Sequence, residues 1–226
     1  MLPLRDNIDS RKRPVMTVLL IVLNVYIFFQ ELSLDEQSLA TLLHTFGLVP
    51  SSLGEALARN PRDIATYLPL ITNLFLHGGW LHLLSNMWYL WLFGDNVEDF
   101  LGRFRFLWFY ACCGLAANLA QLLLDAGTTT PIIGASGAIS GVLGAYLVTF
   151  PWARILTLVP LPIFPFFALL PVPALFFLAF WFLLQVQQGA LALFMTGTNV
   201  AWWAHIGGFL TGIILAKTYK GRRRRV

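Results

Sequence analysis

Charged side chains are scarce in this chain of 226 residues: they make up 12% of it, while hydrophobic ones make up 58%. Soluble chains average about 25% charged and about 45–50% apolar residues. A soluble domain of this length cannot bury so much apolar surface. The composition therefore excludes a typical cytosolic enzyme, a nucleic-acid-binding domain and a disordered chain, and it predicts an integral membrane protein.

Cysteine is also scarce, and the usual ligand patterns of a metal site are missing. The two cysteines, Cys112 and Cys113, are adjacent in an apolar run, where neighbouring helical residues point in divergent directions and pair poorly. The four histidines show neither H-E-x-x-H nor Cys/His ligand spacing. We therefore expect no metal and no cofactor, and the spacing disfavours the alternative of a zinc site formed by His77, His82 and His205.

Long apolar runs, by contrast, are abundant. A helix needs about 20 mostly apolar residues to cross about 30 Å of hydrocarbon. When the chain is divided at its charges and turn residues, six such segments result, at about 15–32, 80–93, 104–124, 136–150, 171–186 and 200–219. The predicted fold is an all-α integral membrane protein with six transmembrane helices, in which residues 1–226 form a single membrane domain.

Lysine and arginine orient these segments, because they stay on the cytoplasmic side of short loops. With both termini cytoplasmic, 13 of the 15 basic residues lie inside, and only Arg59 and Arg62 lie outside. Residues 1–14 and the basic tail 220–226 are then cytoplasmic, and 33–79 form an outer loop with interfacial segments. This bias accounts for the net charge of +4 by topology and by attraction to lipid headgroups, and it disfavours nucleic acid as a partner.

The first segment has an alternative interpretation as a signal peptide, since a basic stretch precedes an apolar run. No small-residue cleavage site follows the run, which favours a retained helix.

Few polar side chains fall inside the predicted spans, and each is a candidate for function because polar groups are costly in lipid. His82 and Asn86 belong to the second span, Ser136 begins the fourth, and His205 belongs to the sixth. In the predicted topology these three spans all enter from the outer face. The four side chains are therefore expected at one depth.

Ser136 stands between Gly134 and Gly137 at the predicted start of a helix. Glycine permits a tight backbone turn, and the unpaired N–H groups of a helix N-terminus favour a developing anion. Such a site suits acyl transfer with an oxyanion hole. Taken alone the serine would be a packing residue. The G-x-S-x-G pattern of α/β-hydrolases is excluded because Ala138 takes the place of its second glycine.

His205 becomes a base for Ser136 if the fourth and sixth spans pack closely. Small residues recur every four positions on both spans, at Gly137, Gly141 and Ala145, and at Ala204, Gly208, Gly212 and Ala216. Such rows let helix backbones approach one another in lipid. His82 and Asn86, four residues apart, share a helical face and are expected to point donors at one developing oxyanion.

Taken in order, these motifs resemble those of the rhomboid family of intramembrane serine proteases, in its basic six-helix bacterial type. The matching positions are His77, His82 and Asn86 in H-x-x-x-x-H-x-x-x-N, Gly134, Ser136 and Gly137 in G-x-S-G, and Ala204, His205 and Gly208 in A-H-x-x-G. The resemblance covers the membrane core from about residue 46 to residue 212.

The resemblance implies a rhomboid-like bundle whose short central fourth helix carries the nucleophile, Ser136. His205 would be the general base, while His82, Asn86 and the Ser136 backbone N–H would line the oxyanion hole. The motif-supporting residues would be His77, Gly134, Gly137 and Gly208. Glu98 would be a structural acid after the second helix. The fifth helix and the outer loop at 187–199 would form a lateral gate and cap.

The sequence departs from the family pattern at two places, which affect the expected orientation of His205 and the expected substrate preference. Leu68-Pro69 stands where some members have a Trp-Arg pair, and Ser140 stands where some have a tyrosine that packs on the histidine.

The implied activity is hydrolysis of peptide bonds in or near transmembrane segments through an acyl-enzyme on Ser136. The partners would be transmembrane protein substrates and membrane lipids, in a bacterial inner membrane with the site toward the outer face. The sequence leaves the oligomeric state open. Two alternatives are a catalytically inactive rhomboid-like protein that binds membrane proteins, and a small transporter, which the single depth of the polar groups disfavours.

Overall fold

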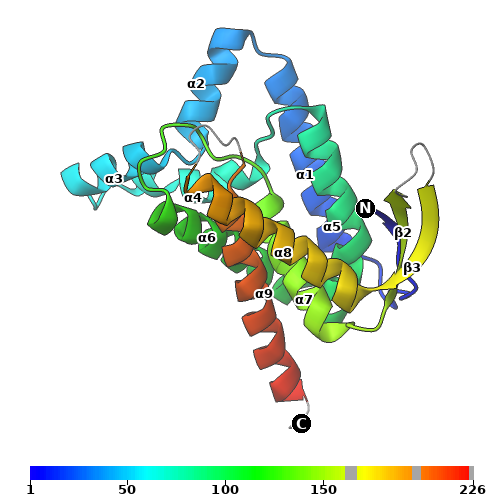
Figure 1. Ribbon diagram of the computed structural model, residues 1–226. Coiled ribbons are helices and arrows are strands. Elements are labelled where there is room, and N and C mark those ends of the chain that lie inside the picture. The colour runs from blue at the N-terminus through cyan, green and yellow to red at the C-terminus, as the bar shows by residue number, and fades with distance from the viewer. Residues whose placement is uncertain (161–166, 195–199, 224–226) are drawn as a thin grey trace.

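The computed structural model describes residues 1–160, 167–194 and 200–223, and the ends of the predicted outer loop 187–199 and basic tail fall outside these ranges. The long helices are α1 (Val15–Leu32), α5 (Trp80–Leu101), α6 (Arg103–Leu124), α7 (Ser136–Thr149), α8 (Ala174–Ala192) and α9 (Trp202–Arg223). The first loop holds α2 (Glu36–Phe46), α3 (Pro50–Arg59), η1 (Ile64–Tyr67), α4 (Pro69–Thr72) and η2 (Asn73–Phe75). In Figure 1, α2 and α3 project from the bundle at the end opposite the C-terminus.

Each predicted span overlaps one of these long helices, but the second, fifth and sixth helices end later than predicted, at Leu101, Ala192 and Arg223, and the fifth also begins later. The second helix continues to Leu101 because Glu98, one of the charges that had ended the prediction, accepts hydrogen bonds from backbone N–H groups far along the chain. The fifth helix begins at Ala174, after Pro171 and Pro173, since proline lacks an N–H and disfavours helical geometry in the residue before it.

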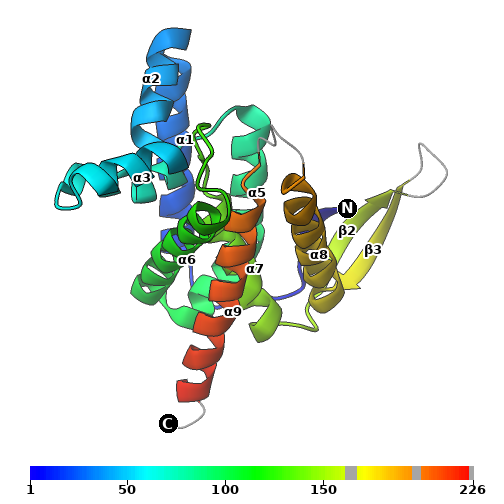
Figure 2. The ribbon, with the colours of Figure 1, turned by 60° about the vertical axis from the view of Figure 1, so that its left-hand side comes forward.

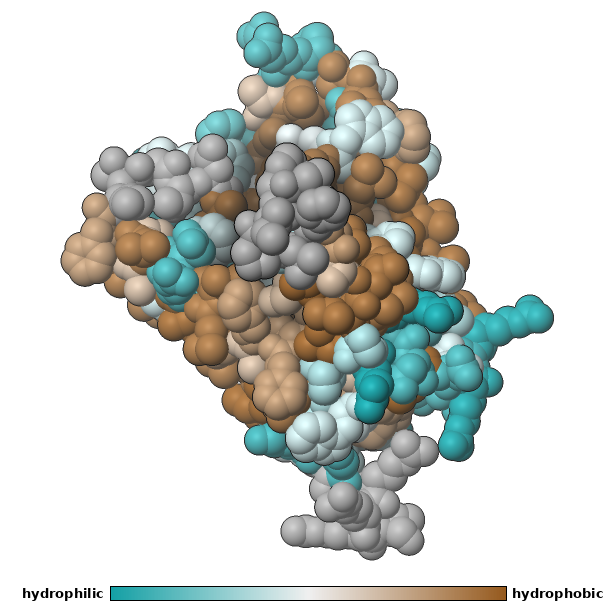
Figure 3. Space-filling view, turned by 45° about the vertical axis from the view of Figure 1, so that its right-hand side comes forward, coloured by the Kyte–Doolittle hydropathy of each residue, from teal (hydrophilic) through white to brown (hydrophobic). Residues whose placement is uncertain are grey.

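Within the part of the chain that the structure describes, three helices, α1, α6 and α8, are long and apolar enough to cross a membrane, with mean hydropathies of 2.0, 1.6 and 1.6. Helix α7 has only 14 residues, roughly 21 Å at 1.5 Å per residue. The count of six spans therefore stays a prediction. Apolar side chains cover much of the face in Figure 3, and hydrophilic ones gather at its top and lower right.

Helix α7 contacts α5, α6, α8 and α9, and its residues 137–146 are all buried. The small-residue rows lie at its contact with α9: a Cβ on Gly208 would meet the carbonyl of Gly137, and one on Gly212 would meet that of Gly141. The predicted close approach of the two segments is confirmed. It brings the N-terminus of α7 against the first turns of α9.

A three-stranded antiparallel sheet makes the all-α prediction wrong. Its strands β1 (Leu2–Arg5), β2 (Arg154–Pro160) and β3 (Phe167–Pro173) are in the order β1-β2-β3. The sheet lies beside α8, outside the helix bundle, and β3 leads directly into that helix (Figure 2). The indole N–H of Trp88 in α5 donates to the carbonyl of Pro3 at 2.7 Å. The N-terminal residues are thereby held between α5 and β2.

Glu98 caps the start of α1, whose own preceding residue, Pro14, provides no side-chain cap. The carboxylate accepts from the backbone N–H groups of Met16 and Thr17 at 3.0 and 2.8 Å, and from the Thr17 hydroxyl at 2.8 Å. It is 2% exposed. Glu98 therefore satisfies N–H groups that the first turn of a helix leaves free, which is a structural role.

Replacing Glu98 with alanine is expected to lower the free energy of unfolding by about 2–4 kcal/mol, because it leaves buried N–H groups of α1 unpaired. Denaturation with SDS in mixed micelles measures the change. The matched control is Asp99→Ala, since Asp99 accepts one exposed bond from the Arg11 N–H and its loss is expected to cost under about 1 kcal/mol. Equal effects of the two variants would contradict the capping role.

Candidate active site

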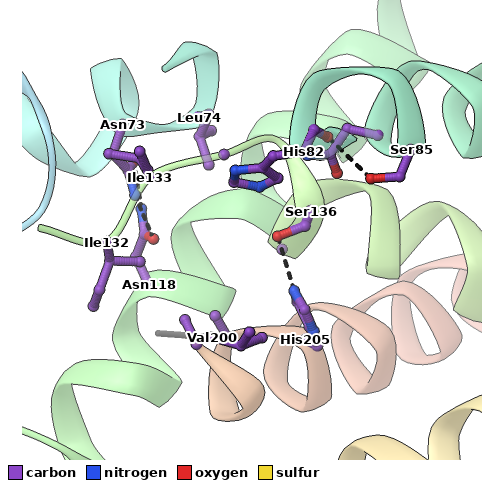
Figure 4. Close-up of a pocket in the computed structure, with 15 residues that line it drawn as sticks. Asn73, Leu74, His82, Ser85, Asn118, Ile132, Ile133, Ser136, Val200 and His205 are labelled. Carbon is purple, nitrogen blue, oxygen red and sulfur yellow. Dashed lines mark hydrogen bonds between the residues drawn. The ribbon is translucent and has the colours of Figure 1, made fainter. Parts of the chain in front are cut away.

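Ser136 and His205 lie at hydrogen-bond distance across the contact of α7 and α9. The Ser136 Oγ is 2.8 Å from His205 Nε2 (Figure 4). Ser136 is the first residue of α7, and His205 lies in the first turn of α9. Where the two helices meet, the contact positions are glycines and carry no side chain. The backbones therefore come close together, and the serine and histidine side chains can reach each other.

Gly134 shapes the turn that precedes the serine. Its φ of 115° is unfavourable for residues with a side chain, and its N–H donates to the carbonyl of Asn73 at 2.8 Å. A Cβ at this position would lie 2.6 Å from His82 Nε2 and 3.7 Å from Asn86 Nδ2. The glycine therefore lets the two α5 side chains lie directly against the backbone before Ser136.

Asn86 carries a buried donor that no described residue accepts from. The side chain is 6% exposed, and its Nδ2 lacks a hydrogen-bond partner among the described parts of the chain. A buried N–H without an acceptor is costly and unusual. His82 lies one turn earlier on the same helix, and both residues line the same cavity as Ser136. Both side chains of the predicted oxyanion pair thus face the nucleophile.

The cavity above the dyad has a volume of about 360 Å³. Its lining comes from η2, α5, α6, α7, the first turn of α9 and the segments before α7 and α9, and the polar members include Asn73, His82, Asn118, Ser136 and His205. A second cavity of about 190 Å³ lies where α5, α7 and α8 meet, and Tyr89, Ser140 and Trp181 are among its lining residues. Ser136 and His205 line both cavities, so the dyad is reached from two sides.

His77 lies behind this site and outside the cavity. It is 2% exposed, its ring lies 5.1 Å from that of His82, and its backbone N–H donates to Glu31 at 3.2 Å. Burial, with a smaller contribution from His82, lowers the pKa of His77 to about 4, so the ring is neutral near pH 7. The residue supports His82 through packing.

Within the described ranges no three His, Cys, Asp or Glu side chains are arranged to hold a metal ion, and the absence of a metal stays a prediction.

Gln185 is a further residue of the site, which the sequence motifs do not indicate. Its side-chain Oε1 lies 2.9 Å from His205 Nδ1, on the side of the ring opposite the serine. The signal was present, because Gln185 is a polar residue within the predicted fifth span, and polar residues in spans are functional candidates.

The comparisons with known proteins agree with the motifs. The Rhomboid domain model matches residues 65–222. The chain belongs to the rhomboid family. Rhomboids are membrane proteins, and with its membrane-length helices this chain is an integral membrane protein.

Three relatives illustrate the range of this rhomboid's similarity. It is 30% identical over 170 residues to "Rhomboid protein 1, mitochondrial" of Saccharomyces cerevisiae, covering 72% of this chain and 46% of the relative. It is 29% identical over 161 residues to "Presenilin-associated rhomboid-like protein, mitochondrial" of Homo sapiens, covering 68% and 38%. It is 42% identical over 82 residues to "Putative rhomboid protease YdcA" of Bacillus subtilis, covering 34% and 39%. The matches thus span less than half of each relative's length.

Two tryptophans flank the histidine of this rhomboid where some members use a tyrosine. The Ser140 hydroxyl donates to the carbonyl of Ser136 at 2.7 Å, so its side chain turns back onto α7. The rings of Trp181 and Trp202 lie 6.2 and 6.1 Å from that of His205. Aromatic packing on the histidine therefore comes from α8 and α9. The second departure, Leu68-Pro69, lies at the start of α4.

Proposed function

We propose that this rhomboid is an intramembrane serine endopeptidase that cleaves peptide bonds in or near the transmembrane segments of other proteins. The observation that carries the proposal is the 2.8 Å contact of Ser136 Oγ with His205 Nε2. The Nδ2 donor of Asn86, which lines the same cavity as the serine and has no acceptor among the described residues, supports it. A nucleophile, a base in contact with it and an adjacent donor are the parts that acyl transfer needs.

In the proposed reaction, Ser136 Oγ attacks the scissile carbonyl carbon while His205 Nε2 takes its proton. The negative charge that develops on the carbonyl oxygen faces the Ser136 backbone N–H and the side chains of Asn86 and His82. His205 then gives the proton to the leaving amine, and an acyl-enzyme remains on Ser136. Water, deprotonated by His205, hydrolyses this ester and restores the serine.

The topology proposed with this function places both termini in the cytoplasm and the dyad toward the outer face. Helix α7 is shorter than about 30 Å of hydrocarbon, so its N-terminus and the cavity above it lie where water has access. The second cavity, between α5 and α8, suits lateral access of a substrate helix beside the predicted gate helix α8. The bacterial inner membrane stays a prediction, since the relatives include mitochondrial and bacterial proteins.

The proposed substrates are membrane proteins whose helix unwinds near the cut, because an intact helix uses its carbonyls in hydrogen bonds. Helix-weakening residues are expected around the scissile bond, with a small residue just before it, as the family resemblance implies. Lipids surround the protein as its solvent.

A fluorophosphonate probe tests the proposal on the purified full chain in liposomes. The expected result is one covalent adduct, located on Ser136 by peptide mass spectrometry, that disappears in Ser136→Ala and in heat-denatured wild type. A fluorophosphonate reacts with a serine only when a base and an oxyanion site activate it. A folded wild type that forms no adduct would favour the catalytically inactive, binding-only alternative.

A further inference from the structure

The histidine of the dyad is held on both sides. Its Nε2 lies 2.8 Å from Ser136 Oγ, and its Nδ1 lies 2.9 Å from Oε1 of Gln185. Gln185 projects from α8, where the eleven residues before it are all apolar, and its side chain is 7% exposed. The contact is part-buried, and because the Gln185 side chain itself is buried, little water competes with its oxygen for Nδ1.

The orientation of the Gln185 amide decides what it can do for the ring, since its oxygen only accepts hydrogen bonds and its nitrogen only donates them. Gln185 Nε2 donates to the carbonyl of Trp181 at 3.2 Å, one turn earlier in α8. That bond directs Oε1 toward His205. An acceptor facing Nδ1 requires the proton on Nδ1, which leaves the lone pair on Nε2.

We propose that Gln185 is a positioning residue that accepts the Nδ1–H of His205 and so holds the histidine in the tautomer whose Nε2 takes the Ser136 proton. The inference rests on the proposed function, and it gives an amide the orienting task that a carboxylate has in a Ser-His-Asp triad. The amide orients the ring without burying a charge in a membrane helix, which would be costly. Trp181 therefore contributes its carbonyl to the amide as well as its ring to the histidine.

Gln185→Leu tests this role, because leucine has nearly the volume of glutamine but no acceptor. The kcat for cleavage of a single-span test substrate in liposomes is expected to fall by about 10- to 100-fold, with KM changed by less than about twofold. The rate of fluorophosphonate labelling at Ser136 is expected to fall by a similar factor. Gln185→Glu keeps an acceptor of the same reach and is expected to stay within about threefold of wild type at pH 8.

The matched control is Gln37→Leu, the same change at an exposed position of α2, away from the site and the predicted gate, which is expected to leave kcat unchanged. The tautomer itself is read from the 15N chemical shifts of histidine-labelled protein, with His205 assigned by comparison with His205→Gln. Wild type is expected to carry its ring proton on Nδ1, and Gln185→Leu to show a mixture of tautomers.

The outcomes separate the two proposals. A wild type that cleaves, with Gln185→Leu equally fast, overturns the positioning role and leaves the proposed function standing. A wild-type His205 with its proton on Nε2 also overturns it, even if Gln185→Leu fails to fold. A wild type that neither cleaves nor labels refutes the proposed function, while the shifts still report whether Gln185 holds Nδ1–H.

Discussion

Replacing Ser136 with alanine is expected to lower kcat/KM for a single-span substrate in liposomes by about 10⁴-fold or more, about 5 kcal/mol of transition-state stabilisation. The reason is that the proposed acyl-enzyme has no other place to form. His205→Ala is expected to cost a similar factor, because the Ser136 hydroxyl then has no base at 2.8 Å.

The double variant Ser136→Ala/His205→Ala sharpens this prediction. Residues that act as one unit are strongly non-additive, so the double variant is expected to be no slower than the slower single variant. If the two losses multiplied, the residues would act in separate steps. If either single variant cleaved at the wild-type rate, the proposed mechanism would be wrong. Thermal unfolding of all three variants confirms that each is folded.

Gly208→Ala is expected to lower the free energy of unfolding by at least about 1–3 kcal/mol and to lower cleavage with it. The added Cβ would meet the carbonyl oxygen of Gly137, which is backbone and cannot rotate away. Helices α7 and α9 must then separate. Gly137 follows Ser136 directly, and Gly208 is three residues after His205. Separation of the helices at these glycines is therefore expected to lengthen the distance from Ser136 Oγ to His205 Nε2.

Gly189→Ala is the matched control, because this glycine is also buried within a helix. A Cβ there would lie 3.5 Å from Ile206, Trp202 and Trp203, an ordinary contact distance. The expected change in stability is within about 1 kcal/mol, with a gain where alanine suits a helix better than glycine. A Gly208→Ala protein as stable as wild type would show that α7 and α9 do not approach this closely.

The sequence predicts the contact of Ser136 with His205 because the signals for it are local. Ser136 and His205 stand out as polar residues within apolar runs, and small residues every four positions indicate which helices approach. Gln185 carries the same signal, yet its role depends on the orientation of one amide, which the bond to Trp181 determines. The oxyanion role of His82 and Asn86 stays a prediction.

Features that depend on partners far along the chain could not be predicted. Helix α5 runs through Glu98 because the N-terminus of α1, about 80 residues earlier, supplies the hydrogen bonds that make a buried carboxylate tolerable. The sheet is a similar case, since β2 is a short apolar run that resembles part of a span. Only pairing with β1 and β3 distinguishes it as a strand.

The register of the sheet has a consequence for the order of assembly during synthesis. Leu2 pairs with Leu158, so β1 leaves the ribosome first and has no strand partner until the chain has been made past β2. Helices α1, α5, α6 and α7 are by then all synthesised. Contacts between such distant residues form late, because the long intervening loop has to close first. Pairing of β1 is therefore a late step of assembly, and it joins a segment synthesised before all of these helices to the strand pair that leads into α8.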